Sequence, residues 1–386
     1  MNLTEAEHLH YTTVREDGVR VIQSWNHRKK GSIGHSVVPE PGDGLRKYDR
    51  EKTEAGYILY TPDHSNKFLL INLEGEIVHE WPVFTSHFGY LLSNGHLLLD
   101  TEFAPDREIG VLELDWDGNE VWFCPCQIHH DFHRLENGNT MLLCQREIEN
   151  CSHIADGSLL STYLYEVTPE CEIVWEWYSE DHTEELVRLV GATFPRDAGD
   201  GDWTHSNTVQ VLSETPASRD PRFKPGNILI SHRNLNTVCV IERSSGEIVW
   251  AWGPGVLEWQ HAVVMLPNGH LLIFDNGPKR MWSAVRELDP ITGNSVWEYK
   301  GNPPSSFCGR YLSNAQRLSN GNTFICSGSP PDHGRLFEVT PEGEIVWEFQ
   351  NPYAEYAEGE LGVYRAYKYP PEMIERFLTN LPTSDG

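Results

Sequence analysis

The chain has 386 residues, of which 39% are hydrophobic and thirteen are tryptophan, so it carries ample apolar surface for a large core. Thirty Lys and Arg residues stand against 57 Asp and Glu residues, which gives a formal net charge of −27. A field of this sign repels nucleic acid and anionic membranes, so we expect neither as a partner. An anionic small substrate would need a local cationic pocket that outweighs the acidic surface.

The sequence as written has neither a leader nor a membrane span. The segment after Met1 has no basic stretch followed by an apolar run, and no stretch reaches about 18 apolar residues. The eight cysteines show no paired metal-ligand spacing, and Cys124 and Cys126 are too close together for a usual metal clip. We therefore expect mostly reduced cysteines and a cytoplasmic protein, or a periplasmic one if a leader precedes Met1.

A repeated pattern follows the polar N-terminal extension, residues 1–54. Each repeat ends in a turn followed by a strand rich in aromatic residues, and these turns begin at Gly75, Gly118, Cys171, Gly246, Gly293 and Gly343. The first repeat has His79 at the fifth position, and the others have Trp122, Trp175, Trp250, Trp297 and Trp347. An Asn-Gly turn between two apolar strands, a strong hairpin signal, marks the earlier half of four repeats, at 94–95, 137–138, 268–269 and 320–321.

These marks divide the chain into six units of four strands each, roughly 55–82, 87–123, 130–178, 205–253, 261–299 and 313–349. One small sheet cannot bury its own apolar faces, so such units pack around a ring. The sequence therefore predicts an all-β protein with one domain over residues 55–350, a six-bladed β-propeller. Alternate residues of a strand share one face, so we expect the tryptophans to pack between blades. We expect the extensions 1–54 and 351–386 to close the ring, the latter with a short helix over 370–378.

Two insertions interrupt the repeats. Residues 181–202 open with a predicted helix over 184–190 and continue into an acidic, Gly-containing loop, which we interpret as a loop over the mouth of a pocket or as an exposed turn. The polar segment 213–225 lengthens the hairpin of the fourth unit and could reshape a pocket there.

Histidines recur at one level of the repeats. Seven residues before the Asn of an Asn-Gly turn lie His87, His130 and His261, while the fifth hairpin has Ser313 at this position. The lengthened hairpin begins with His205, which we place at the same strand start. The first strand of each propeller blade lines the central channel, so these side chains should form a ring around the axis. Arg233, at the end of the second strand of the lengthened hairpin, can grip an oxyanion through two parallel hydrogen bonds.

The segments around these residues resemble a known family. They are 129–131 (His-His-Asp), 202–207 (Asp-Trp-Thr-His-Ser-Asn), 231–234 (Ser-His-Arg-Asn), and Gln260-His261 ahead of 267–277. They are similar, in the same order, to the bacterial aryl-sulfate sulfotransferases that use no nucleotide sulfate donor, and the likeness covers most of residues 45–350. The resemblance implies a six-bladed propeller that moves a sulfuryl group from an aryl sulfate ester to a phenol in its central channel.

The resemblance also implies roles for individual residues. His261 falls on the nucleophile that forms a sulfohistidine in a ping-pong reaction, and His130, His205 and Arg233 fall on the groups that stabilise the anion. We add four candidate substrate-binding residues: His87, His129, Arg310 and Tyr311. No cofactor and no metal site are predicted; the expected partners are a small aryl sulfate and a phenolic acceptor, and the oligomeric state is left open.

Three alternatives stay open at this point. Polysaccharide lyases on propeller scaffolds also use His, Arg and Tyr at a channel mouth, and Arg310-Tyr311 precedes the fifth hairpin. A non-catalytic binding platform is the second alternative, because a fold does not determine a function. The third is a metal held by histidines of several blades. Neighbouring residues of a strand point to opposite faces, so His129 and His130 are not expected to converge on one ion by themselves.

Overall fold

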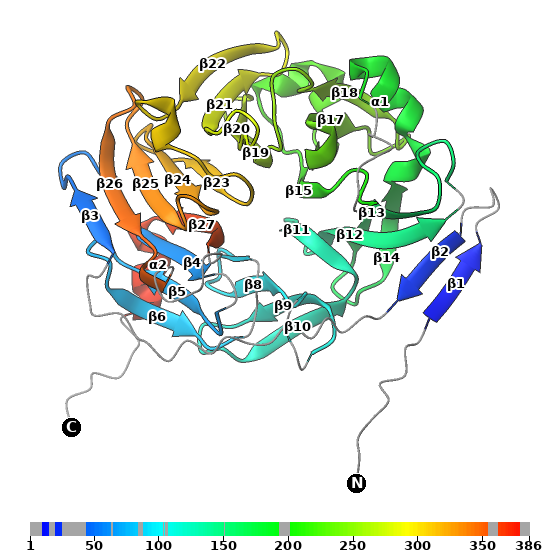
Figure 1. Cartoon of the computed structure of the whole chain (residues 1–386). Coiled ribbons are helices and arrows are strands. Elements are labelled where there is room, and N and C mark those ends of the chain that lie inside the picture. The colour runs from blue at the N-terminus through cyan, green and yellow to red at the C-terminus, as the bar shows by residue number, and fades with distance from the viewer. Residues whose placement is uncertain are drawn as a thin grey trace.

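The computed structural model describes residues 44–62, 65–83, 88–102, 104, 107–149, 151–192, 201–353 and 362–378, together with the backbone of 10–14 and 20–24. Six small antiparallel sheets stand around a common centre, and each runs from an inner strand to an outer one (Figure 1). The predicted all-β, six-bladed propeller is confirmed.

Each blade is given from its innermost to its outermost strand. Blade 1 consists of β27 (Val363–Tyr369), β4 (Tyr57–Pro62), β5 (Phe68–Ile71) and β6 (Ile77–Trp81). Blade 2 consists of β7 (Gly89–Leu91), β8 (Leu97–Asp100), β9 (Gly110–Leu114) and β10 (Glu120–Pro125). Blade 3 consists of β11 (Ile128–Arg134), β12 (Thr140–Glu149), β13 (Ser158–Val167) and β14 (Ile173–Tyr178).

The remaining three blades follow the same order. Blade 4 consists of β15 (Ser206–Val211), β16 (Ile228–His232), β17 (Thr237–Ile241) and β18 (Ile248–Trp252). Blade 5 consists of β19 (His261–Met265), β20 (Leu271–Asp275), β21 (Ala284–Asp289) and β22 (Asn294–Tyr299). Blade 6 consists of β23 (Asn314–Arg317), β24 (Thr323–Ser327), β25 (Arg335–Val339) and β26 (Ile345–Gln350).

Both chain extensions contribute strands to the ring. The prediction that residues 55–82 hold a complete blade is wrong, because they supply three strands and the innermost strand is β27, which pairs antiparallel with β4. The C-terminal extension thus closes the ring. From the N-terminal extension, β3 (Leu45–Tyr48) adds to the outer edge of blade 6, and the hairpin of β1 (His10–Val14) and β2 (Arg20–Ser24) pairs through β2 with β12.

The ribbon tryptophans join neighbouring blades, as predicted. An indole N–H in an outer strand donates to a backbone carbonyl in the last turn of the next blade; the pairs are Trp122 to Pro169, Trp175 to Arg243, Trp297 to Pro341 and Trp347 to Leu73, at 2.7–3.1 Å. These turns need a left-handed residue, which is usually Gly; Cys171 takes this conformation at φ 63°. The sequence repeat is therefore also a repeat of contacts between blades.

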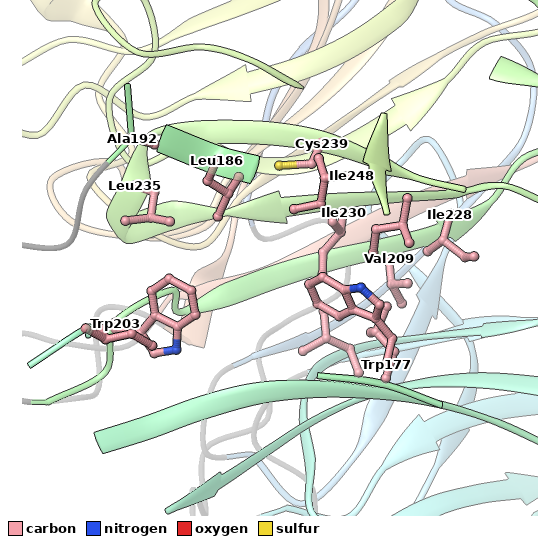
Figure 2. Packing of buried hydrophobic residues seen from close by; sticks show 14 of the residues in the cluster. Trp177, Leu186, Ala192, Trp203, Val209, Ile228, Ile230, Leu235, Cys239 and Ile248 are labelled. Carbon is pink, nitrogen blue, oxygen red and sulfur yellow. The ribbon is translucent and has the colours of Figure 1, made fainter. Parts of the chain in front are cut away.

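Two short α-helices pack against the blades in the described part of the chain, and both were predicted. Helix α1 (Thr183–Val190) has two glutamates in its first turn and ends at Gly191 in the left-handed conformation. Its Leu186 joins Trp177, Ile230 and Cys239 in the core between blades 3 and 4 (Figure 2). Helix α2 (Pro371–Leu378) packs Ile374 into the cluster between blades 1 and 2. Among the described residues no helix is long and apolar enough to cross a membrane.

The cysteines differ in part from the expectation. Cys124 of β10 and Cys171 form a disulfide across blades 2 and 3, while the other six cysteines are not disulfide-bonded. Cys124, Cys126 and Cys171 border a cavity of about 290 Å³ between these blades. The expected reduced state thus describes six of the eight cysteines in this structure.

Candidate functional site

The candidate site lies where three neighbouring inner strands begin. Strands β11, β15 and β19 follow one another around the centre of the ring (Figure 1). Each has an irregular pairing close to its start, between Ile128 and Asp131, between Ser206 and Thr208, and between His261 and Val264. Left-handed residues accompany these irregularities: His130 (φ 73°), His205 (φ 44°) and Ala262 (φ 47°). Such bulges re-aim side chains, and here they act on the histidines singled out by the sequence.

His129, His130 and His205 meet ring to ring. The ring centroids of His129 and His130 lie 3.9 Å apart, and the ring of His205 lies 5.2 Å from the first and 4.7 Å from the second. The expectation that His129 and His130 point to opposite faces is wrong. Alternation requires extended backbone, and the left-handed conformation of His130 at the bulge breaks it.

His205 does not share the strand register of the other two ring histidines. His130 and His261 lie five residues before Leu135 and Leu266, whose N–H groups close their hairpins, whereas His205 lies seven residues before Leu212 in the same role. The predicted register of His205 is therefore wrong by two residues. Its ring still meets His130, because Asp202 accepts the backbone N–H of His205 at 2.9 Å and so holds the turn that leads into β15.

A carboxylate orients the imidazole of His205. Oδ2 of Asp202 lies 2.6 Å from Nδ1 of His205, so Nδ1 carries the proton and donates it. Gln145 donates to the same oxygen at 2.8 Å. Although burial by itself raises the pKa of Asp202, its hydrogen bond to His205 and the nearby imidazoles lower the pKa to about 2. Asp202 is thus an anion whenever the site works near neutral pH.

His261 has a different environment, because none of the carboxylates that the structure describes hydrogen-bonds to its ring. Nδ1 lies 2.9 Å from the carbonyl oxygen of Trp259 and 2.8 Å from Oδ1 of Asn276. The amide of Asn276 is oriented by its own donations to the carbonyls of Gly309 and Leu312, at 2.7 and 3.0 Å. Two acceptors face Nδ1, so Nδ1 carries the proton and Nε2 keeps its lone pair. Burial, and next the charge of Arg233, hold the pKa of His261 well below its usual range.

Arg233 supplies the positive charge next to these histidines. It follows β16 directly, in the short 3₁₀ turn η4 (Arg233–Leu235), and does not lie in the strand itself. Its guanidinium stacks on the ring of Trp259 at 4.7 Å and donates to Oδ1 of Asn234 at 3.1 Å. Arg233 is close to both histidines: its charge lowers the pKa of His261, and its backbone N–H contacts the carbonyl of His205.

The other predicted site residues have different positions. His87 lies outside the described residues. Arg310 is exposed and Tyr311 is half-buried, in the loop that leads into β23, where Ser329 accepts the N–H of Tyr311 at 3.0 Å. The insertion 213–225 forms the short 3₁₀ turns η2 (Pro216–Arg219) and η3 (Pro221–Phe223) beyond the end of β15. This end of the strand is opposite to His205, so the expectation that the insertion reshapes the pocket has no support in the structure.

A buried ion pair next to the site was missed by the sequence analysis. Arg365 of β27 donates to Oδ1 of Asp131 at 3.0 Å and to the carbonyl of Asn207 at 2.6 Å. Asp131 also accepts the N–H of Val209 at 2.8 Å, so the pair joins blades 1, 3 and 4. Asp131 and Asn207 were visible next to the histidines in the sequence, but nothing in it indicated that residue 365 would reach them.

The chain is similar to a known protein family and to several solved structures. The family described as Arylsulfotransferase (ASST) matches residues 110–352, from the third strand of blade 2 to the end of blade 6. A protein of unknown function from Bacteroides caccae has a similar solved structure, with 15% identity and a TM-score of 0.55 over 82% of this chain and 99% of its own. This likeness shows the fold alone.

Two further solved structures have lower TM-scores. The β-propeller domain of Cps50 (Swd1) from Myceliophteria thermophila gives 0.42 at 12% identity, over 82% of this chain and 88% of its own. Hydrazine synthase from Kuenenia stuttgartiensis gives 0.37 at 10% identity, over 67% of this chain and 64% of its own. No curated protein matched the chain.

Proposed function

We propose that this chain, which belongs to the arylsulfotransferase family, moves a sulfuryl group from an aryl sulfate ester to a phenolic acceptor through a covalent adduct on His261. The family match supports arylsulfotransferase-type activity, and hence a transferase, in a propeller fold. The covalent intermediate, the residue that carries it and the phenolic acceptor are our proposal.

One observation carries the proposal: Nδ1 of His261 is the donor to two oxygen atoms, those of Trp259 and Asn276. The lone pair on Nε2 is then the nucleophile. A nucleophile must be unprotonated, and burial together with the charge of Arg233 keeps the pKa of His261 low enough for this. The ring is 1% exposed, so little water competes for a bound sulfuryl group.

In the first half-reaction Nε2 of His261 attacks sulfur, a nitrogen–sulfur bond forms and the bond from sulfur to the aryl oxygen breaks. The electron pair of the broken bond leaves with the phenolate, which takes a proton from an imidazole of the cluster. The ring of His261 now has substituents on both nitrogens and is positively charged. The oxygens of Trp259 and Asn276 stabilise this charge through Nδ1.

In the second half-reaction the oxygen of the acceptor phenol attacks the same sulfur. The nitrogen–sulfur bond breaks, its electrons return to Nε2, and the phenol proton passes to an imidazole of the cluster. Arg233 is suited to hold the sulfuryl oxygens in both halves, because its guanidinium donates in a planar fork. His130 and His205 are the candidates for the proton transfers, since imidazole titrates near neutral pH.

The test compares His261→Ala with His270→Ala. His270 lies in the same hairpin, at its other end, and pairs with Glu287 at 2.7 Å, so it is a matched control outside the site. We expect wild type and His270→Ala to release phenol from a chromogenic aryl sulfate in a burst and to gain the mass of one sulfuryl group. His261→Ala should show neither and should fold normally. An adduct that persists in His261→Ala, or turnover that needs donor and acceptor bound together, would contradict the proposal.

A further inference from the structure

The imidazoles of His129, His130 and His205 form a cluster that does not include His261. One ligand nitrogen each of His129, His130 and His205 can be chosen so that all three lie within 4.8 Å of one another. His129 is 8% exposed, and the other two are half-buried. We propose that this cluster is a binding site for a divalent metal of the zinc type, with three imidazole ligands and one open position. The site goes beyond the proposed sulfuryl transfer and stands without it.

The backbone explains how two successive residues serve one ion. The bulge between Ile128 and Asp131 and the left-handed His130 bring the rings of His129 and His130 together. A left-handed residue also precedes β23, at Ser313, without a histidine. The bend is therefore a property of the inner strands, and the consecutive histidines make it a candidate ligand pair.

Asp202 provides an independent observation that points to a metal. A metal-bound imidazole usually donates its other ring N–H to a carboxylate, which orients the ring and makes it a stronger ligand. Nδ1 of His205 donates to Asp202 at 2.6 Å, so Nε2 would be the ligand atom. Gln145 and the N–H of His205 in turn orient Asp202. The cluster thus has the outer contacts of a metal site as well as its ligands.

The ligand set selects among metals. Neutral imidazoles suit zinc and its neighbours in the first transition series, whereas magnesium and calcium take oxygen ligands. Tetrahedral zinc–imidazole bonds of about 2.0–2.1 Å place ligand nitrogens roughly 3.3 Å apart, so the rings need to close by about 1.5 Å at most. Three histidines with one open position form a catalytic type of zinc site.

The ion would also change the anion site, a consequence that rests on the proposed function. With His130 and His205 bound to metal, the open position takes a sulfuryl oxygen beside Arg233. The metal then supplies the positive charge in place of the imidazole N–H groups. Because a metal-bound imidazole nitrogen has no proton to exchange, the proton transfers proposed for His130 and His205 apply only to the metal-free site.

The experiment uses the full chain purified without a histidine tag and stripped with a chelator. Cobalt(II) serves as the probe, because tetrahedral cobalt absorbs visible light strongly, and zinc is counted by elemental analysis after gel filtration. We expect one equivalent of either metal and an increase in melting temperature on binding. Binding should disappear in His129→Gln and His205→Gln, and Asp202→Asn should weaken it about 10- to 100-fold.

The matched controls are His96→Gln and His270→Gln, each of which removes an imidazole that pairs with a glutamate outside the channel. Both should bind one equivalent. Less than one equivalent in folded wild type, or unchanged binding in the folded His129→Gln and His205→Gln variants, overturns the proposal. His261→Ala should keep the metal and lose the sulfuryl adduct, so the two proposals fail independently.

Discussion

The inner and the outer strands of the same blades differ in how closely their contacts and side chains repeat from blade to blade. Among the described residues, the outer strands repeat one contact, an indole N–H bonded to a backbone carbonyl of the next blade, in five of the six blades. The starts of the inner strands share bulges and left-handed residues but differ in the side chains they carry, which include histidines and buried charges such as Arg365 and Asp131. Regular contacts at the outside hold the ring, and departures from the repeat at the inside make a site.

This difference predicts where substitutions act. Changes at the inner rim, defined here as the starts of the inner strands with Arg233, His232 and Arg365, should affect catalysis or change the free energy of unfolding by several kcal/mol. Changes in the ribbons should cost little stability and no activity. Four substitutions test this contrast.

Arg365→Leu should have the largest effect on stability. It leaves the carboxylate of Asp131 buried without its guanidinium partner, and breaking such a pair costs about 3–5 kcal/mol. Because Arg365 lies on the strand that closes the ring, we expect the free energy of unfolding, measured in urea, to fall by this amount. The double variant Arg365→Leu, Asp131→Asn removes the unpaired charge and keeps an acceptor for the N–H of Val209, so it should recover much of the loss. Equal loss in the single and double variants would show that the charge is not the cause.

Arg233→Met should lower kcat/KM at least about 100-fold, because it removes a charged donor to the sulfuryl oxygens. Arg233 also lowers the pKa of His261, after burial the second cause, so its removal raises that pKa. His261 reacts only when neutral, so the acidic limb of the pH profile should move to higher pH. Arg243→Met is the control, since Arg243 pairs with Glu166 in an outer turn. An unshifted acidic limb would contradict the assigned role of His261.

His232→Asn should change how stability depends on pH. Burial, and next the charge of His182, lower the pKa of His232 from 6.5 to about 3 in the folded protein. As pH falls below 6.5, His232 takes up a proton in the unfolded chain but stays neutral in the folded one. Relative to neutral pH, this lowers the free energy of unfolding of wild type by about 3 kcal/mol at about pH 4. Asparagine keeps an acceptor for Ser206 and does not titrate. The free energies of unfolding of the two proteins, measured in urea at several pH values, should therefore diverge below pH 6.5. The same pH dependence in both proteins would refute the prediction.

Trp297→Phe should have the smallest effect. It removes the indole donor to the carbonyl of Pro341, an exposed hydrogen bond worth about 1 kcal/mol or less, and keeps an aromatic ring. Thermal unfolding should shift slightly, and turnover of an aryl sulfate should be unchanged. A large loss of activity would mean that ribbon and inner rim are coupled, and the contrast drawn between them would fail.

Much of the scaffold was predictable from the sequence because its signals are local. Turn residues, alternating apolar residues and the ribbon tryptophans recur with each blade, so blade number, hairpins and the inner position of His130 and His261 follow from periodicity. The helices over 184–190 and 370–378 do not recur, but they too were predicted from local sequence. The prediction of a complete blade within residues 55–82 was wrong because the missing strand lies some three hundred residues away, at Val363–Tyr369.

The sequence by itself thus determined the repeat, the ribbon contacts and which histidines stand near the axis. Only the tertiary structure decided how these groups meet: that β27 completes blade 1, that His129 and His130 face the same side, and that Asp202 and Asn276 give His205 and His261 different environments. The physical reason is the separation along the chain of the residues that have to interact. A repeat is encoded within each unit, whereas convergence at the centre depends on a left-handed residue, a bulge and partners from other blades.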